Sequence, residues 1–206
     1  MVAQSEQAEK IEQAHAPARN GRWSFSTADY HRMAEVGILS EDDRVELIDG
    51  EIRLMSPISS RHASIVNRMN AFLSAQFGKA AIVSIQNSII LNDKTEPQPD
   101  LVLLRFRDDF YEEATPTAAD VLLLIEVSDS TLAYDRQEKL PRYAQAGIPE
   151  VWLIVLEYQI IEHYAGPNGT QYEMKQTFKR GQTIALPIAQ LTIAVDDIFG
   201  QTSAKS

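Results

Sequence analysis

The chain has 206 residues, of which 44% are hydrophobic and 23% charged, and this balance supports one globular domain with a buried core. It contains no cysteine, which excludes disulfides, thiolate metal sites and cysteine nucleophiles and favours the cytoplasm. The formal net charge of −10 argues against broad non-specific binding to nucleic acid, unless bound cations reverse the local sign. No apolar run is long enough to cross a bilayer, so we expect no membrane partner.

The first 20 residues are polar and contain no apolar segment of the kind found in secretory signals. They predict a flexible tail, because they offer little apolar surface to bury. We expect a single domain over residues 21–200 and a second short tail at 201–206.

The first part of this domain predicts a helix, a hairpin and a long helix. Ser26 has the character of an N-cap for a short amphipathic helix that stops at Gly37. The pair Asp49-Gly50 between two alternating runs is a strong hairpin signal. Apolar residues at helical spacing over 59–77 then predict a long amphipathic helix.

The rest of the chain is dominated by strand patterns. The continuous apolar run at 121–127 predicts a strand buried on both faces. A helix is expected over 134–146, and Pro141 either kinks it or lies in the first turn of a regular part that starts near Lys139. Further strand patterns lie at 81–85, 89–91, 100–104 and 151–155, and at 160–164 and 172–178 around a turn at 166–169.

This order of elements predicts an α/β or mixed α+β fold. A mixed central sheet would be flanked by helices, and the C-terminal part would be rich in β-hairpins.

Glu126 does not fit an ordinary buried strand, because it interrupts the most hydrophobic run of the chain. A lone buried carboxylate is costly unless it is paired or coordinated. Either the strand ends at Ile125 and Glu126 points into solvent, or Glu126 is buried and has a partner.

Asp100 is a candidate partner. It follows Pro99 at the start of the predicted strand at 100–104, although aspartate is also a common turn residue at such a place. If the strands of Asp100 and Glu126 pair, both carboxylates can face one cleft. Two or three converging oxygen ligands with a backbone carbonyl beside them are what Mg²⁺ or Mn²⁺ takes.

Three further residues are candidates for the same chemistry. Lys139 could orient an attacking water or offset negative charge on phosphorus, although a helix lysine is usually solvated. Glu46 could bring a third acid from the strand before the predicted turn, although alone it is an ordinary strand glutamate. His62 opens the long helix and is a general base, a phosphate donor, a partner of a ligand, or a residue without chemistry.

An ordered set of short motifs extends over most of the chain. The motifs are Glu46-Leu47-Ile48-Asp49-Gly50-Glu51-Ile52, Met55-Ser56-Pro57, His62, Gln98-Pro99-Asp100-Leu101, Ile125-Glu126-Val127-Ser128, Asp135, Lys139, Tyr143, Gly147 and Pro149-Glu150-Val151-Trp152-Leu153. From about Phe25 to Phe199 the set resembles the Uma-type restriction endonucleases. This family is abundant in cyanobacteria and belongs to the PD-(D/E)XK nuclease superfamily.

The resemblance implies a restriction-endonuclease-like core with a metal held by Asp100 and Glu126. It also implies the Val127 carbonyl as an extra ligand and Glu46 as a further acid. Ser128 stands where the superfamily usually has its lysine, and the family pattern gives that role to Lys139.

Together these features predict a Mg²⁺- or Mn²⁺-dependent endonuclease that hydrolyses DNA phosphodiester bonds, with His62 and Gln98 supporting the site. The alternative is a catalytically silent module with a nuclease fold that binds DNA or a protein partner, which the net acidity favours. We also expect a homodimer, because cutting both strands commonly uses two sites related by a two-fold axis.

Overall fold

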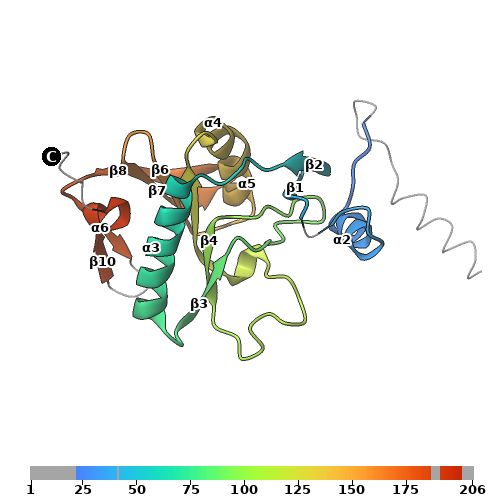
Figure 1. Ribbon diagram of the computed structural model, residues 1–206, viewed down its shortest axis with the longest axis horizontal. Helices are drawn as coiled ribbons and strands as arrows, with labels where there is room; N and C mark the ends of the chain where they lie inside the picture. Colours follow the sequence, from blue (N-terminus) through green and yellow to red (C-terminus); the bar gives the residue numbers. More distant parts are fainter. Residues whose placement is uncertain (1–21, 41, 187–190, 201–206) are drawn as a thin grey trace, which may run out of the picture. The chain divides into compact units, whose positions relative to one another are not determined.

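The computed structural model describes residues 22–40, 42–186 and 191–200, which form two compact units (Figure 1). The first unit comprises the described residues up to Met55 together with Ile90–Pro97, and the second comprises Ser56–Ile89 and the described residues from Gln98 onward. The expected tails at 1–20 and 201–206 lie outside the described residues, and the single domain over 21–200 stays a prediction.

The first unit contains the predicted helix and hairpin. Helix α2 (Thr27–Glu35) begins after Ser26, whose hydroxyl accepts from the backbone of Asp29 while the Asp29 carboxylate accepts from the backbone of Ser26. Strands β1 (Val45–Ile48) and β2 (Glu51–Leu54) pair antiparallel around Asp49 and Gly50. Both turn residues have positive φ, 51° and 78°, as a tight two-residue hairpin requires.

The segment 90–97 returns to this unit and corrects one prediction. The strand expected at 89–91 is wrong, because the chain turns back on itself there: Leu91 N–H donates to the Thr95 carbonyl at 2.9 Å. The side chain of Asn92 accepts from the backbone of Lys94 and closes the turn. An apolar run of three residues was too short to distinguish a strand from the arm of a turn.

A six-stranded mixed sheet of order β3-β4-β5-β6-β7-β8 forms the second unit, and this confirms the predicted fold class (Figure 1). Strands β5 and β6 are parallel, and all other neighbours in the sheet are antiparallel. The strands are β3 (Ala81–Ile85), β4 (Leu101–Arg105), β5 (Val121–Ser128), β6 (Glu150–Val155), β7 (Ile160–Asn168) and β8 (Gln171–Lys179).

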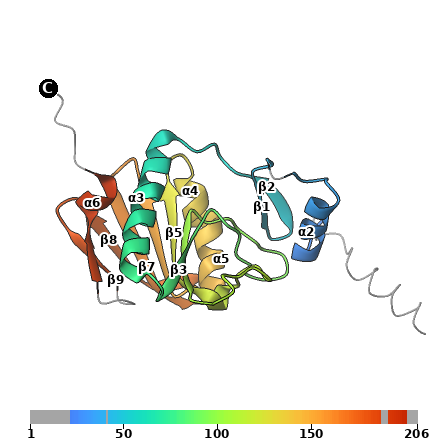
Figure 2. The same cartoon turned by 60° about the horizontal axis from the view of Figure 1, so that its bottom comes forward.

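Helix α3 (Ser60–Phe77) covers one face of the sheet, and the helical segment between β5 and β6 covers the other, with β5 between them (Figure 2). Side chains alternate along β5, so Leu123, Ile125 and Val127 enter the core under α3. The alternate residues, Glu126 among them, therefore face the helical segment. The hairpin β9 (Thr183–Leu186) and β10 (Leu191–Ala194) and helix α6 (Val195–Phe199) complete the α3 side, and the short η1 (Ala118–Asp120) leads into β5.

The helical segment between β5 and β6 is built in three parts. Helix α4 (Leu132–Tyr134) continues into a π-helical turn, η2 (Asp135–Lys139), and then into α5 (Leu140–Gln145). Pro141 lies in the first turn of α5, which confirms the second of the two arrangements expected for it. The wide turn closes through the Leu140 N–H, which donates to the Asp135 carbonyl five residues earlier.

The C-terminal hairpins are confirmed, with one shift of a turn. Strand β7 continues through Gly166 and Pro167 to Asn168, and β8 begins at Gln171, so the turn lies at Gly169 and Thr170 rather than at 166–169. Tyr172 pairs with Pro167 on the neighbouring strand. Proline is tolerated at such a place because it removes only one donor from the sheet.

The packing of α3 on the sheet gives the first prediction. Leu73 is fully buried on the face of α3 that packs into the core. Leu73→Ala should therefore lower the free energy of unfolding by about 2–5 kcal/mol, because apolar contact is lost and a cavity remains. Urea denaturation measures the change. Gln76→Ala, an exposed site three residues along the same helix, is the control and should change stability by less than about 0.5 kcal/mol.

Candidate metal centre

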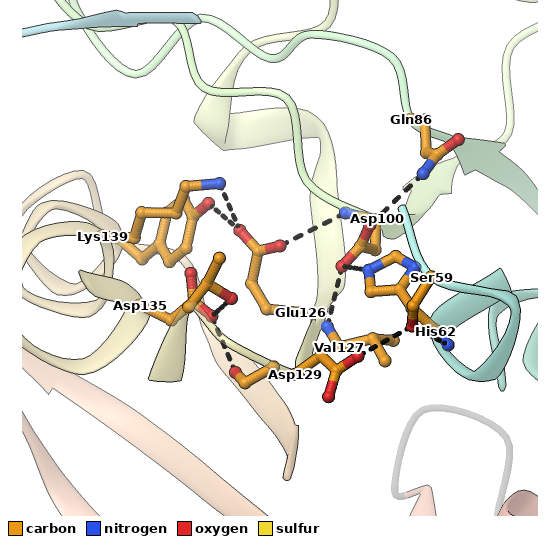
Figure 3. A network of polar contacts seen from close by, with 12 residues as sticks. Ser59, His62, Gln86, Asp100, Glu126, Val127, Asp129, Asp135 and Lys139 are labelled. Carbon is orange, nitrogen blue, oxygen red and sulfur yellow. Dashed lines mark hydrogen bonds and ion pairs between the residues drawn. The ribbon is translucent and has the colours of Figure 1, made fainter. Parts of the chain in front are cut away.

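The two carboxylates singled out by the sequence lie together in the second unit. Glu126 is 3% exposed on β5, so the solvent-facing alternative is wrong. Asp100 immediately precedes β4, whose first residue, Leu101, pairs with Ile125. This register brings the backbone N–H of Asp100 to 3.4 Å from Oε2 of Glu126, and Figure 3 shows the two carboxylates beside each other.

Asp100 is oriented through its Oδ2 atom. That oxygen accepts from the Val127 N–H at 2.8 Å and lies 3.0 Å from Nε2 of His62, the residue in the first turn of α3. The other oxygen, Oδ1, lies 3.5 Å from the side-chain amide of Gln86. Contacts with a backbone N–H and an imidazole at one oxygen fix the rotamer of Asp100.

Glu126 is held from the helical side through its Oε1 atom. The Tyr143 hydroxyl donates to this oxygen at 2.6 Å, and Nζ of Lys139 donates to it at 3.1 Å. Burial raises the pKa of the Glu126 carboxyl to about 8, although the charge of Lys139 lowers it, and the negative charge of Asp100 raises it further. Burial is therefore the main cost of ionising Glu126, and Lys139 offsets only part of it.

The carbonyl of Val127 is available on the same side as Asp100. Strand β4 pairs with β5 only as far as Ile125, so β4 leaves the backbone of Val127 without a ladder partner on that edge. The N–H of Val127 already points to Asp100, and the N–H and C=O of one strand residue point to the same side. The Val127 carbonyl therefore lies on the same edge of β5 as Asp100.

Ser128, at the end of β5, has a structural partner of its own. Its hydroxyl donates to Oδ2 of Asp135 at 2.7 Å, and the Thr131 hydroxyl donates to the same oxygen at 2.7 Å. Burial raises the pKa of the Asp135 carboxyl, in opposition to Lys139 and the two hydroxyls. This contact ties the end of β5 to η2, the turn that carries Lys139.

The remaining predicted residues are placed as follows. Lys139 is 6% exposed, which excludes the solvated helix lysine considered above. Gln98 is partly buried two residues before Asp100. Glu46 belongs to the first unit, where it is buried on β1 and paired in register with Arg53 of β2.

Sequence reasoning missed three residues that contact the carboxylates or their neighbours: Gln86, Asp135 and Tyr143. Two of them left a signal, because Asp135, Lys139 and Tyr143 recur at a spacing of four, which places them on one helical face. Gln86 left none. It reaches Asp100 only because β3 pairs with β4 and the chain turns at Gln86, whose φ is 51°.

The donor set fits a small hard dication. Oδ1 of Asp100 and Oε2 of Glu126 have contacts of 3.5 and 3.4 Å, whereas the partner oxygen of each carboxylate has strong donors. Within the described ranges no group of three or more histidine, aspartate or glutamate side chains gathers as a metal cluster. Mg²⁺ and Mn²⁺ suit a site with two carboxylates, because such ions keep several waters.

The site thus consists of two carboxylates where adjacent strands of a mixed sheet meet, and the sheet is shared with a putative nuclease of known structure. The chain matches the model of the Uma2 family, described as "Putative restriction endonuclease", over residues 27–196. It therefore belongs to this family, as the sequence motifs predicted.

A solved structure supports the assignment of the fold. It is a putative nuclease of the DUF820 family from Anabaena variabilis ATCC 29413, with a TM-score of 0.62 and 18% identity, and the match covers 80% of this chain and 95% of that chain. A comparison with curated proteins gave no match. None of the helices in the described ranges is long and apolar enough to span a membrane.

His62 gives the second prediction. His62→Ala removes the side chain that contacts Oδ2 of Asp100, so the affinity for Mn²⁺ should fall by about 10–100-fold. Isothermal titration calorimetry with MnCl₂ measures it. His31→Ala serves as the control, because its imidazole contacts Glu96 within the first unit, and an equal loss in both variants would contradict the role of His62.

Proposed function

We propose that this protein is a divalent-metal-dependent endonuclease that hydrolyses DNA phosphodiester bonds. The observation that carries the proposal is the environment of Glu126: a buried carboxylate, beside a second carboxylate and in contact with a buried lysine. At a buried glutamate with a purely structural role, cationic partners would balance the charge of the ionised carboxylate, as they do at Glu162. Arg136, Lys175 and Tyr164 all donate to Glu162 and hold its pKa below the usual value despite burial.

Asp100 and Glu126, with the Val127 carbonyl, would hold Mg²⁺ or Mn²⁺. Such an ion lowers the pKa of a bound water and polarises a phosphoryl oxygen. Contacts with Val127 and His62 would hold the carboxylate of Asp100 in place for the ion, and hydrogen bonds from Tyr143 and Lys139 would hold that of Glu126.

Lys139 has a second task in this proposal. Its Nζ lies 3.1 Å from Oε1 of Glu126, and Lys139 is buried. Inside the protein the charge of a cation is screened less than in solvent. From this place it would orient the attacking water and offset the negative charge that develops on the phosphoryl group. The lysine reaches the site from η2, whereas the superfamily places it on the strand at the position of Ser128.

Three further parts of the proposal come from the sequence and the family. Glu46 would be a further acid of the site, and Gln98 would support it together with His62. We further propose that the protein acts in the cytoplasm, which a chain without cysteine favours. We also propose a homodimer, because two sites related by a two-fold axis can cut both DNA strands. Sedimentation equilibrium tests the dimer, and a monomer at working concentration would contradict it.

The experiment is a cleavage assay on supercoiled, linear and branched DNA with MgCl₂, with MnCl₂ and with EDTA. Cleavage should require a divalent ion and should stop in EDTA. No cleavage of any substrate with either ion, by protein that binds Mn²⁺ in calorimetry, would contradict the proposed reaction.

A second candidate function is a catalytically silent module that binds DNA or a protein partner. The net charge of −10 favours it, because phosphate neutralisation supplies most of the affinity of non-specific DNA binding. Such a module should keep its DNA affinity in EDTA and lose little of it in Asp100→Ala. The proposed nuclease should show neither property, since its substrate contacts depend on the bound ion.

A further inference from the structure

Tyr143 was absent from the predicted site, yet it makes the shortest hydrogen bond to either carboxylate. It is fully buried on α5, and its hydroxyl lies 2.6 Å from Oε1 of Glu126. A hydroxyl that donates to an ionised carboxylate in a buried place forms a short and strong bond. Tyr143 therefore restricts Glu126 more than ordinary packing would.

The two oxygens of Glu126 differ as a result. Oε1 accepts from both Tyr143 and Lys139, while Oε2 is turned towards Asp100, with the Asp100 N–H at 3.4 Å (Figure 3). A carboxylate with one oxygen already bound by two donors cannot offer both oxygens to an ion without breaking those bonds.

The donors to Oε1 are themselves fixed to the sheet. Lys139 and Tyr143 lie four residues apart on the helical face that begins with Asp135. Asp135 accepts from Ser128 at the end of β5, so this face is anchored to the strand that carries Glu126. Ser128 thus anchors the helical segment from which Lys139 and Tyr143 reach the carboxylate of Glu126.

We propose that Tyr143 is a positioning residue that leaves Glu126 a single oxygen for a cation and so favours Mg²⁺ and Mn²⁺ over Ca²⁺. The inference rests on the proposed metal-dependent function. Mg²⁺ takes about six ligands in a strict octahedron, whereas Ca²⁺ takes about 6–8 and often binds both oxygens of a carboxylate. A glutamate held at Oε1 suits the first geometry and not the second.

The test is calorimetry of Mn²⁺ and Ca²⁺ binding to the full chain and to Tyr143→Phe, without DNA. The variant keeps the ring and loses the shorter of the two hydrogen bonds to Oε1, so only Lys139 still holds that oxygen and it can turn towards the ion more easily. The ratio of Ca²⁺ to Mn²⁺ affinity should rise by roughly tenfold. Loss of packing alone would weaken both ions alike and leave the ratio unchanged.

Tyr164→Phe is the matched control. It removes a buried tyrosine hydroxyl that donates to another buried glutamate, Glu162, at 2.8 Å, and Glu162 keeps Arg136 and Lys175. The affinity ratio should not change in this variant. An unchanged ratio in Tyr143→Phe would overturn the inference, and so would an equal rise in both variants.

Failure of the proposed metal site gives a different result, since the wild-type protein would then bind neither ion, and failure of the proposed reaction alone would leave the binding ratio measurable. If Tyr143→Phe does not fold, a crystal of the wild-type protein soaked in MnCl₂ decides the question. One oxygen of Glu126 at the ion, with Tyr143 on the other, supports the inference. Both oxygens of Glu126 at the ion overturn it.

Discussion

Glu126→Gln should abolish metal-dependent cleavage of DNA, with a fall in rate of at least about 10³-fold. The substitution keeps the volume of the side chain and an oxygen that can accept from Tyr143 and Lys139, but it removes the charge that would hold a cation next to Asp100. Burial raises the pKa of this carboxyl to about 8, so ionising it in the folded protein costs stability that an uncharged Gln does not cost, and the free energy of unfolding in EDTA at neutral pH should not fall. Activity and stability should therefore change independently.

The measurement is cleavage of supercoiled DNA at saturating MnCl₂, followed by calorimetry with the same ion. Glu150→Gln is the control, since Glu150 is another mostly buried glutamate of the sheet, and its Oε2 lies 3.3 Å from Nε2 of His163. It should keep both Mn²⁺ binding and cleavage. Metal-dependent cleavage that survives in Glu126→Gln would remove Glu126 from the site and point to a contaminant or a different centre.

Stability of the metal-free protein should fall as the pH rises from about 4.5 to about 8. The ordinary pKa of the Glu126 carboxyl is 4.5, and burial raises it to about 8 in the folded protein. Between these values the folded state keeps a proton that the unfolded state has lost, so the slope of stability against pH is negative. One such group contributes at most about 1.4 kcal/mol per pH unit.

Urea denaturation in EDTA at several pH values measures this slope. Asp135, whose pKa is also raised by burial, contributes to the slope in the same direction, so the wild type is compared with Glu126→Gln, which retains Asp135. The free energy of unfolding of Glu126→Gln should rise relative to that of the wild type as the pH increases from about 4.5 to about 8. Parallel curves for the two proteins would show that Glu126 does not titrate there.

Manganese should reverse the trend. A carboxylate must lose its proton before it binds a cation, so the increase in Tm caused by MnCl₂ should grow from pH 6 towards pH 8 in the wild type. Glu126→Gln should show little increase at any pH. An increase of equal size in both proteins would mean that Mn²⁺ binds elsewhere.

Much of the fold followed from local patterns in the sequence. Helix α3 and the hairpin at Asp49-Gly50 are local features, set by apolar spacing and by turn residues that accept positive φ. The apolar run at 121–127 likewise predicted the buried strand β5. Glu126 stood out within it because few side chains are more costly to bury alone.

The sequence by itself determined the family and singled out the two carboxylates as candidates for a metal site, because these inferences depend on residue types and their order. The partners of each carboxylate oxygen were decided only by the tertiary structure. Gln86 meets Asp100 through the pairing of β3 with β4, and Tyr143 meets Glu126 through the crossover between two parallel strands. Such contacts join residues distant in sequence, and no local pattern records them, because strand pairing and helix packing place those residues together only in the folded chain.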